Sequence, residues 1–196
     1  MAGRARTHRG AGLPTVQLRF KSQDAAAVRA EIRAAVEAVR GTASLLFIND
    51  HWREAIAAGA YGVHLGQEDL DTLTAAELAE IRHAGLRLGL STHGYTEMLR
   101  ADAVGPSYLA LGAVFPTTLK AMVTPPQGTG RLQAYARLLR QRSLVAIGGI
   151  SAEQLPEVAA SGVGSFAVVR AITSAADPEA AAAALQQAWA ALQAEI

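Results

Sequence analysis

The sequence contains no cysteine, no long hydrophobic run and almost no net charge. The absence of cysteine excludes a disulfide framework, a thiolate metal site and a cysteine nucleophile. No apolar stretch approaches the roughly 20 residues that a membrane-spanning helix needs, so we expect no membrane partner. A formal net charge of +1 gives no argument for nucleic acid binding. Together these absences are compatible with a cytoplasmic protein, which is the location we expect.

Short apolar runs alternate with amphipathic stretches along the 196 residues, and this alternation indicates βα units around a parallel sheet. We expect strands at 15–21, 45–50, 62–65, 86–91, 108–114, 144–149 and 165–169. We expect helices at 23–39, 53–58, 72–83, 95–103, 131–140, 152–160 and 178–195. Polar residues and glycines gather where the strands end, as in a barrel whose site lies at the carboxyl ends of its strands. The sequence therefore predicts an α/β protein with a (β/α)8 TIM-type barrel.

One βα unit of such a barrel is missing from the count, because seven strands can be assigned where a complete barrel has eight. The missing unit should precede Thr15, but residues 1–13 show no periodicity and are expected to be irregular. We therefore expect a single barrel domain over residues 14–196 that lacks most of the first βα unit. Three explanations stay open: a start codon placed too late, a partner subunit of a homo-oligomer that covers the open edge, or a decayed paralogue.

Two of the expected strands end in carboxylates. The apolar run at 62–65 is followed by Asp69, and the run at 45–48 leads directly into Asn49 and Asp50. Two adjacent strands that each end in a carboxylate can hold a divalent cation between them. Mg²⁺ prefers one or two carboxylates together with waters and phosphate oxygens, so a phosphate ligand would be its natural companion. The alternative is that these acids only cap the helices that follow.

Two further segments suggest ligand binding. The segment 15–21 alternates strictly between apolar and polar side chains. In an open antiparallel sheet its polar face would simply meet water, whereas in a barrel strand it would direct Gln17, Arg19 and Lys21 into the mouth. The loop at 115–128 is rich in proline and threonine, and loops longer than about 12 residues are usually functional or disordered.

Taken together, six motifs resemble thiamine-phosphate synthase, a compact (β/α)8 barrel enzyme. In family order they are QLRFK at 17–21, IND at 48–50, GVHLGQED at 62–69, STH at 91–93, FPTTLK at 115–120 and AIGGI at 146–150. The resemblance implies a Mg²⁺-dependent transferase of thiamine biosynthesis that couples hydroxymethylpyrimidine diphosphate with thiazole phosphate, giving thiamine phosphate and pyrophosphate. The family is thought to react through a carbocation-like pyrimidine intermediate. Such chemistry depends on neutralising the leaving-group charge and aligning the two partners.

The resemblance also implies a role for each matched residue. Mg²⁺ would be held by Asp50 and Asp69. The residues implied to act in catalysis are Arg19, Lys21, Ser91 and Lys120. Substrate contacts are implied for Gln17, Arg19, Lys21, Asn49, Ser91, Thr117, Thr118, Lys120, Gly149, Val169 and Arg170.

Some positions depart from the family pattern. Leu119 replaces a phosphate-contacting threonine, and Arg170 stands where the family usually has a serine, adding a cation near the expected phosphate. The related thiazole tautomerase uses a histidine where this chain has Ala113, which favours the synthase. A third candidate, a non-catalytic binder of phosphate ligands, is favoured by the missing βα unit and opposed by the intact Mg²⁺ and diphosphate residues.

Three residues near the expected site are interpreted as structural. His64 lies within an apolar run, which favours a core or wall histidine over a catalytic one. Glu68 is interpreted as a solvated neighbour of Asp69, and His93 as a residue with structural hydrogen bonds.

Overall fold

The computed structural model describes residues 12–118 and 124–194 of the chain. The chain forms two compact units, unit 1 over residues 1–89 and unit 2 over residues 90–196. The irregular segment expected at 1–13 lies almost wholly outside the described residues, and so does Lys120. The assignment of residues 14–196 to a single domain stays a prediction.

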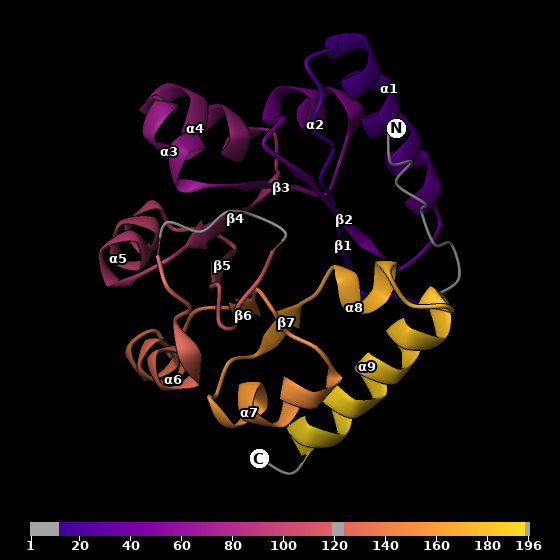
Figure 1. Cartoon of the computed structure of the whole chain (residues 1–196). Coiled ribbons are helices and arrows are strands. Elements are labelled where there is room, and N and C mark those ends of the chain that lie inside the picture. Colours follow the sequence, from indigo (N-terminus) through magenta and orange to yellow (C-terminus); the bar gives the residue numbers. More distant parts are fainter. Residues whose placement is uncertain (1–11, 119–123, 195–196) are drawn as a thin grey trace. The chain divides into compact units, whose positions relative to one another are not determined.

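Unit 1 is built from βα units. Its strands are β1 (Thr15–Leu18), β2 (Leu45–Asn49), β3 (Gly62–Leu65) and the first half of β4 (Arg87–Thr92). Its helices are α1 (Ala25–Val39), α2 (Trp52–Ala58), α3 (Gln67–Thr72) and α4 (Ala75–His83). Strand β2 pairs in parallel with both β1 and β3. Helices α1 and α2 pack beside each other (Figure 1).

Unit 2 continues the same alternation. After the end of β4, its strands are β5 (Tyr108–Leu111), β6 (Leu144–Ile147) and β7 (Ser165–Ala167). Its helices are α5 (Tyr95–Val104), α6 (Gly128–Leu138), the short 3₁₀ helix η1 (Ala152–Gln154), α7 (Leu155–Ala160), α8 (Arg170–Thr173) and α9 (Pro178–Ala194). Strand β6 pairs in parallel with both β5 and β7. Helix α9 runs along α7 and α8 (Figure 1), and its Trp189 ring lies 4.9 Å from the ring of Phe166 on β7.

The order of the strands in the sheet is their order in the sequence, from β1 to β7. Successive βα units with parallel pairing produce this order, so the expected α/β fold class is confirmed, with seven strands and intervening helices in the described ranges. None of the helices in the described ranges combines the length and the hydrophobicity that crossing a bilayer requires.

Local sequence sets where the helices begin. The Asp24 carboxylate caps α1 by accepting hydrogen bonds from the N–H groups of Ala26 and Ala27 at 2.8 and 3.2 Å. Thr74 and Glu77 form a reciprocal capping box at the start of α4. The expected single helix at 72–83 is therefore wrong at its start: α3 ends at Thr72 and α4 begins at Ala75.

Several boundaries differ from the expected ones because strands end early. Strand β1 stops at Leu18, so Arg19 and Lys21 lie beyond it. The expected strand at 108–114 ends at Leu111, and a Cβ atom at the next residue, Gly112, would lie 2.1 Å from the carbonyl oxygen of Ile147. Only glycine allows the two backbones to approach so closely there. Helix α8, which follows β7, was not expected from the sequence.

Candidate active site

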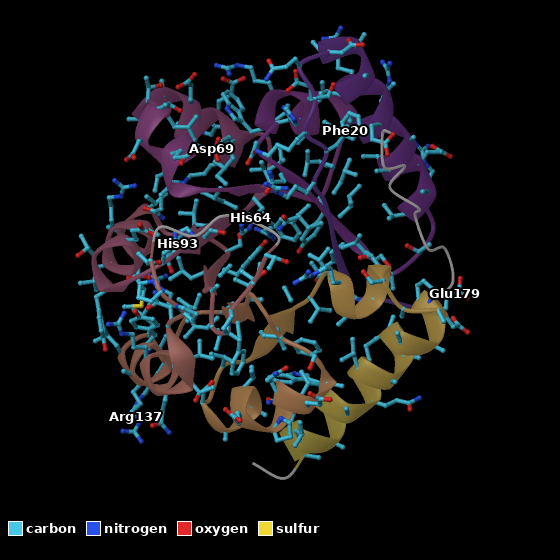
Figure 2. All side chains as sticks on the ribbon, in the orientation of Figure 1. Phe20, His64, Asp69, His93, Arg137 and Glu179 are labelled. Carbon is cyan, nitrogen blue, oxygen red and sulfur yellow. The ribbon has the colours of Figure 1, made fainter. Side chains whose placement is uncertain are left out.

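The two acids expected to bind a cation lie together in unit 1. Asp50 directly follows β2, and Asp69 lies in the first turn of α3, after β3 (Figure 2). Because β2 and β3 are parallel neighbours, their carboxyl ends lie at the same edge of the sheet. The carboxyl group of Asp50 lies close enough to that of Asp69 to raise the pKa of Asp69, through its negative charge and as a hydrogen-bond acceptor for the protonated form. Two carboxyl groups in such contact share either a proton or a cation.

The environment of Asp69 disfavours its ionised form. Desolvation is the largest cause that raises the pKa of its carboxyl above the usual range, and the charge of Asp50 raises it further. The N–H of Gly66, which donates to Asp69 at 2.9 Å, and the charge of Lys21 act in the opposite direction. The hydrogen bond from Gly66 also caps α3, so the helix-capping alternative that the sequence left open holds for Asp69, and cation binding by the same carboxylate stays a prediction.

The donor set fits a magnesium ion better than a transition metal. In the described part of the chain, no group of three or more His, Cys, Asp or Glu side chains is arranged to hold a metal ion. A pair of carboxylates that leaves most coordination positions to water and phosphate oxygens is typical of Mg²⁺. Asp50 and Asp69 therefore suit a cation that arrives with a phosphate-bearing substrate.

Lys21 completes this charged cluster. Its ammonium group donates a hydrogen bond to the Asp50 carboxylate and forms an ion pair with it. Asp50 has a φ of +67°, a left-handed conformation that is uncommon for residues other than glycine, and its N–H donates to the carbonyl of His64 at 2.9 Å. Residues in such conformations cluster at functional sites.

The segment 17–21, which carries the residues expected to bind the diphosphate, is held in place through its residue Phe20. Nε2 of His51, at the start of α2, lies 3.3 Å from the carbonyl oxygen of Phe20. Phe20 separates Arg19 from Lys21, so this contact fixes the backbone between the two cations. The side chains of Gln17, Arg19 and Lys21 are all exposed to solvent.

Asn49 and His64 lie opposite each other in the β2–β3 pair. Asn49 is 9% exposed and His64 4% exposed. Burial lowers the pKa of His64 to about 4, against the opposing effect of the Asp50 charge. His64 is therefore neutral at neutral pH, and its interpretation as a core histidine is confirmed.

In unit 2, the structure brings together two residues expected to bind the thiazole phosphate. Nη1 of Arg170, at the start of α8, donates to the hydroxyl of Thr118 at 2.7 Å. Thr118 belongs to the loop after β5, and Arg170 follows β7, so the contact joins segments 52 positions apart. Thr117 is half-buried in the same loop, and Val169 is exposed.

Gly149 packs tightly against that loop. Its φ is +70°, and a Cβ atom would lie 2.5 Å from the carbonyl oxygen of Pro116. The loop beside Thr117 therefore rests on a residue that must be glycine.

Ser91, another expected contact, lies half-buried near the end of β4.

Sequence reasoning missed one residue of unit 2, Gln127. This glutamine is 7% exposed and hydrogen-bonds through both ends of its side-chain amide. A glutamine between a loop and a helix carries no signal in the sequence that would single it out.

The hydrogen-bonding role expected for His93 is confirmed, because its Nδ1 and its backbone N–H each lie 2.8 Å from Oε2 of Glu97.

Comparisons with known proteins give a consistent result. The family profile of thiamine monophosphate synthase matches residues 4–172. The thiamine-phosphate synthase of Neisseria meningitidis serogroup A is 55% identical over 179 residues, which cover 91% of this chain and 86% of that protein. The thiamine-phosphate synthase of Yersinia pseudotuberculosis serotype O:1b is 51% identical over 175 residues, which cover 89% of this chain and 80% of that protein.

Solved structures show the same similarity. A thiamine phosphate pyrophosphorylase from Pyrococcus furiosus matches with a TM-score of 0.83 and 28% identity, over 95% of this chain and 88% of that chain. A 3-hexulose-6-phosphate synthase from Salmonella typhimurium matches with a TM-score of 0.69 and 17% identity, over 92% of this chain and 88% of that chain. At this low identity the match shows only that the two proteins share a fold.

Proposed function

The chain belongs to the thiamine monophosphate synthase family, and from that premise we propose how it couples hydroxymethylpyrimidine diphosphate with thiazole phosphate. In the reaction, the thiazole ring nitrogen forms a bond to the pyrimidine methylene carbon. The bond from that carbon to the diphosphate oxygen breaks, and pyrophosphate leaves with the electron pair. The single observation that carries this proposal is the contact of Asp50 with both Asp69 and Lys21.

We assign the diphosphate to residues of unit 1. Lys21 acts as a point charge and Arg19 as a planar fork of N–H donors, and Gln17 adds a neutral donor. Their exposure leaves all three side chains accessible to a ligand. Asn49, at the end of β2, contacts the pyrimidine. These residues bind and orient the substrate, and their charges stabilise the departing pyrophosphate.

Asp50 and Asp69 are the residues that would hold Mg²⁺. When bound, the metal supplies positive charge to the oxygens of the leaving group. Desolvation is the main cause that raises the pKa of Asp69, and the nearby charge of Asp50 adds to it. A cation between the two carboxyl groups would offset the repulsion between them, which supports this role.

We assign the thiazole phosphate to residues of unit 2. Thr117, Thr118 and Arg170 bind its oxygens, and the hydrogen bond between Arg170 and Thr118 supports a shared anion site. The Arg170 guanidinium offsets the hydroxyl that is lost at Leu119. Three further contributions rest on the sequence motifs: the backbone at Gly149 and at Val169 adds to this phosphate site, and the Lys120 ammonium bridges toward the pyrophosphate.

Ser91 completes the proposed set by donating a hydrogen bond to the pyrimidine substrate or its leaving group. The proposal includes a cytoplasmic location, supported by the absence of cysteine, and small molecules as the only substrates.

A coupling assay tests the function. Purified protein is incubated with both heterocyclic substrates and Mg²⁺, and thiamine phosphate is followed by chromatography, with a chelator in a parallel sample. We expect product that requires both substrates and disappears with the chelator. The proposal fails if folded protein gives no product. Isomerisation of a thiazole phosphate tautomer without the pyrimidine substrate would indicate the tautomerase instead.

A further inference from the structure

We propose that Gln127 is a positioning residue that holds the β5–α6 loop, described at residues 112–118 and 124–127, against the turn after β4. This inference rests on the proposed binding of thiazole phosphate by that loop. Gln127 acts through the loop and not by touching a substrate.

The side-chain amide of Gln127 is used at both ends. Its nitrogen donates a hydrogen bond to the carbonyl oxygen of His93. Its oxygen accepts a hydrogen bond from the Tyr135 hydroxyl at 2.9 Å, and Nη1 of Arg131 lies 3.4 Å away. Because Gln127 is buried, losing either partner leaves a polar group without water to replace it.

The backbone of Gln127 closes the base of the loop. Its N–H donates to the carbonyl of Ala113 at 2.8 Å, and the N–H of the next residue, Gly128, donates to the carbonyl of Val114 at 3.0 Å. The two ends of the loop are therefore joined where β5 has ended and α6 begins. Thr118 and its partner Arg170 lie beyond this closed base.

His93, whose carbonyl oxygen accepts the hydrogen bond from Gln127, is also held in place. His93 follows Ser91 by two residues and is held at the start of α5 (Figure 2) by the Glu97 carboxylate, which accepts from both its backbone N–H and Nδ1. Gln127 thus links the β4 end, which carries Ser91, to the loop that carries Thr118. Both segments belong to unit 2, so the bridge lies within one compact unit.

The binding of the two substrates should therefore depend on Gln127 to different extents. The thiazole phosphate depends on the loop, so loosening the loop should weaken its binding. Most residues assigned to the pyrimidine diphosphate belong to unit 1, and Ser91 belongs to strand β4 and not to the loop, so the binding of this substrate should change less. A residue with a purely structural role would affect both substrates alike or only the stability of the protein.

The test compares Gln127→Glu with Tyr135→Phe in the full-length protein with Mg²⁺. Gln127→Glu keeps the acceptor for Tyr135 but removes the N–H that donates to His93. Tyr135→Phe removes a donor to the same amide oxygen and leaves the bridge to His93 in place. KM is measured separately for each substrate, with kcat and the thermal midpoint of unfolding.

We expect Gln127→Glu to raise KM for thiazole phosphate about tenfold, as the loss of one buried hydrogen bond implies, and to change KM for pyrimidine diphosphate less than about twofold. We expect Tyr135→Phe to change both KM values less than about twofold. Equal changes in both KM values, or a lower midpoint with unchanged KM, would overturn the proposal.

Calorimetry with thiazole phosphate alone separates this inference from the proposed function. If the wild-type protein binds that ligand but makes no thiamine phosphate, the coupling function fails. The positioning role then stands or falls on whether Gln127→Glu weakens binding by the same factor. Undiminished binding would contradict it.

Discussion

The ammonium group of Lys21 pairs with the carboxylate of Asp50 although 29 positions separate them in the sequence. With Asp69, the three groups carry one positive and two negative charges when ionised, which would repel a diphosphate. A bound Mg²⁺ would reverse the sign of this net charge and make the cluster attractive to the same ligand. The metal and the diphosphate should therefore bind cooperatively.

Replacing Asp50 with asparagine tests this cluster. Asparagine tolerates the left-handed backbone at this position, so the variant should fold, but it removes one charged ligand of the proposed cation. We expect kcat/KM to fall about 100-fold, in the range seen when a residue that stabilises transition-state charge is lost. We also expect a higher Mg²⁺ concentration for half-maximal activity, measured by titrating the metal in the coupling assay.

Glu68→Gln provides the matched control for that variant. Glu68 is exposed and lies next to Asp69. The Glu68→Gln substitution removes one negative charge, as Asp50→Asn does. Its activity and Mg²⁺ dependence should match those of the wild type. If both variants shift the metal titration equally, the effect is one of general surface charge and the assignment of Asp50 is wrong.

His64 should make the stability of the protein depend on pH. Burial lowers its folded-state pKa to about 4, below the ordinary histidine value of 6.5. Between these values the unfolded chain binds more protons, so the free energy of unfolding is highest above pH 6.5 and decreases as the pH falls toward 4. The decrease should amount to at most about 3 kcal/mol, measured by urea unfolding at several pH values.

His64→Gln should reduce this slope whatever it does to the absolute stability, because glutamine does not titrate. His83→Gln is the control, since His83 is exposed at the end of α4. An unchanged slope in the His64 variant would show that other groups determine the acid sensitivity.

The sequence was sufficient to predict that Asp50 and Asp69 meet, because each follows an apolar run and parallel neighbours end at the same edge. It did not reveal α3, because the hydrogen bond from Gly66 to Asp69 starts a helix within the expected loop. Gln127 could not be predicted, because its partner His93 lies 34 positions away and its burial depends on packing. The hydrophobic pattern gives the order and approximate positions of the strands, whereas their exact ends and the long-range side-chain contacts need the folded structure.

Arg170→Ala should weaken thiazole phosphate binding. The variant removes the guanidinium that hydrogen-bonds Thr118 and, in the proposed function, a phosphate oxygen. We expect KM for thiazole phosphate to rise about tenfold, as the loss of one charge-assisted hydrogen bond implies, with little change for the pyrimidine substrate. Steady-state kinetics with each substrate varied in turn measures both values.

Arg137→Ala removes an equal charge from the exposed surface of α6 and should leave both constants unchanged. A decrease in KM for Arg170→Ala would mean that the arginine obstructs the phosphate and does not bind it.

Gly149→Ala and Gly162→Ala form a matched pair that separates backbone strain from steric conflict. Both glycines have positive φ values, +70° and +83°, so alanine at either position should cost about 1–2 kcal/mol through the left-handed backbone. At Gly162 the new Cβ atom would lie 3.8 Å from Ala136, an ordinary contact, whereas at Gly149 it would lie 2.5 Å from the Pro116 carbonyl. Urea unfolding should therefore show a larger loss of stability for Gly149→Ala, by about 1–3 kcal/mol of overpacking. Because Pro116 precedes Thr117, only this variant should also raise KM for thiazole phosphate, and equal losses of stability in the two variants would contradict the close packing of Gly149 against the loop.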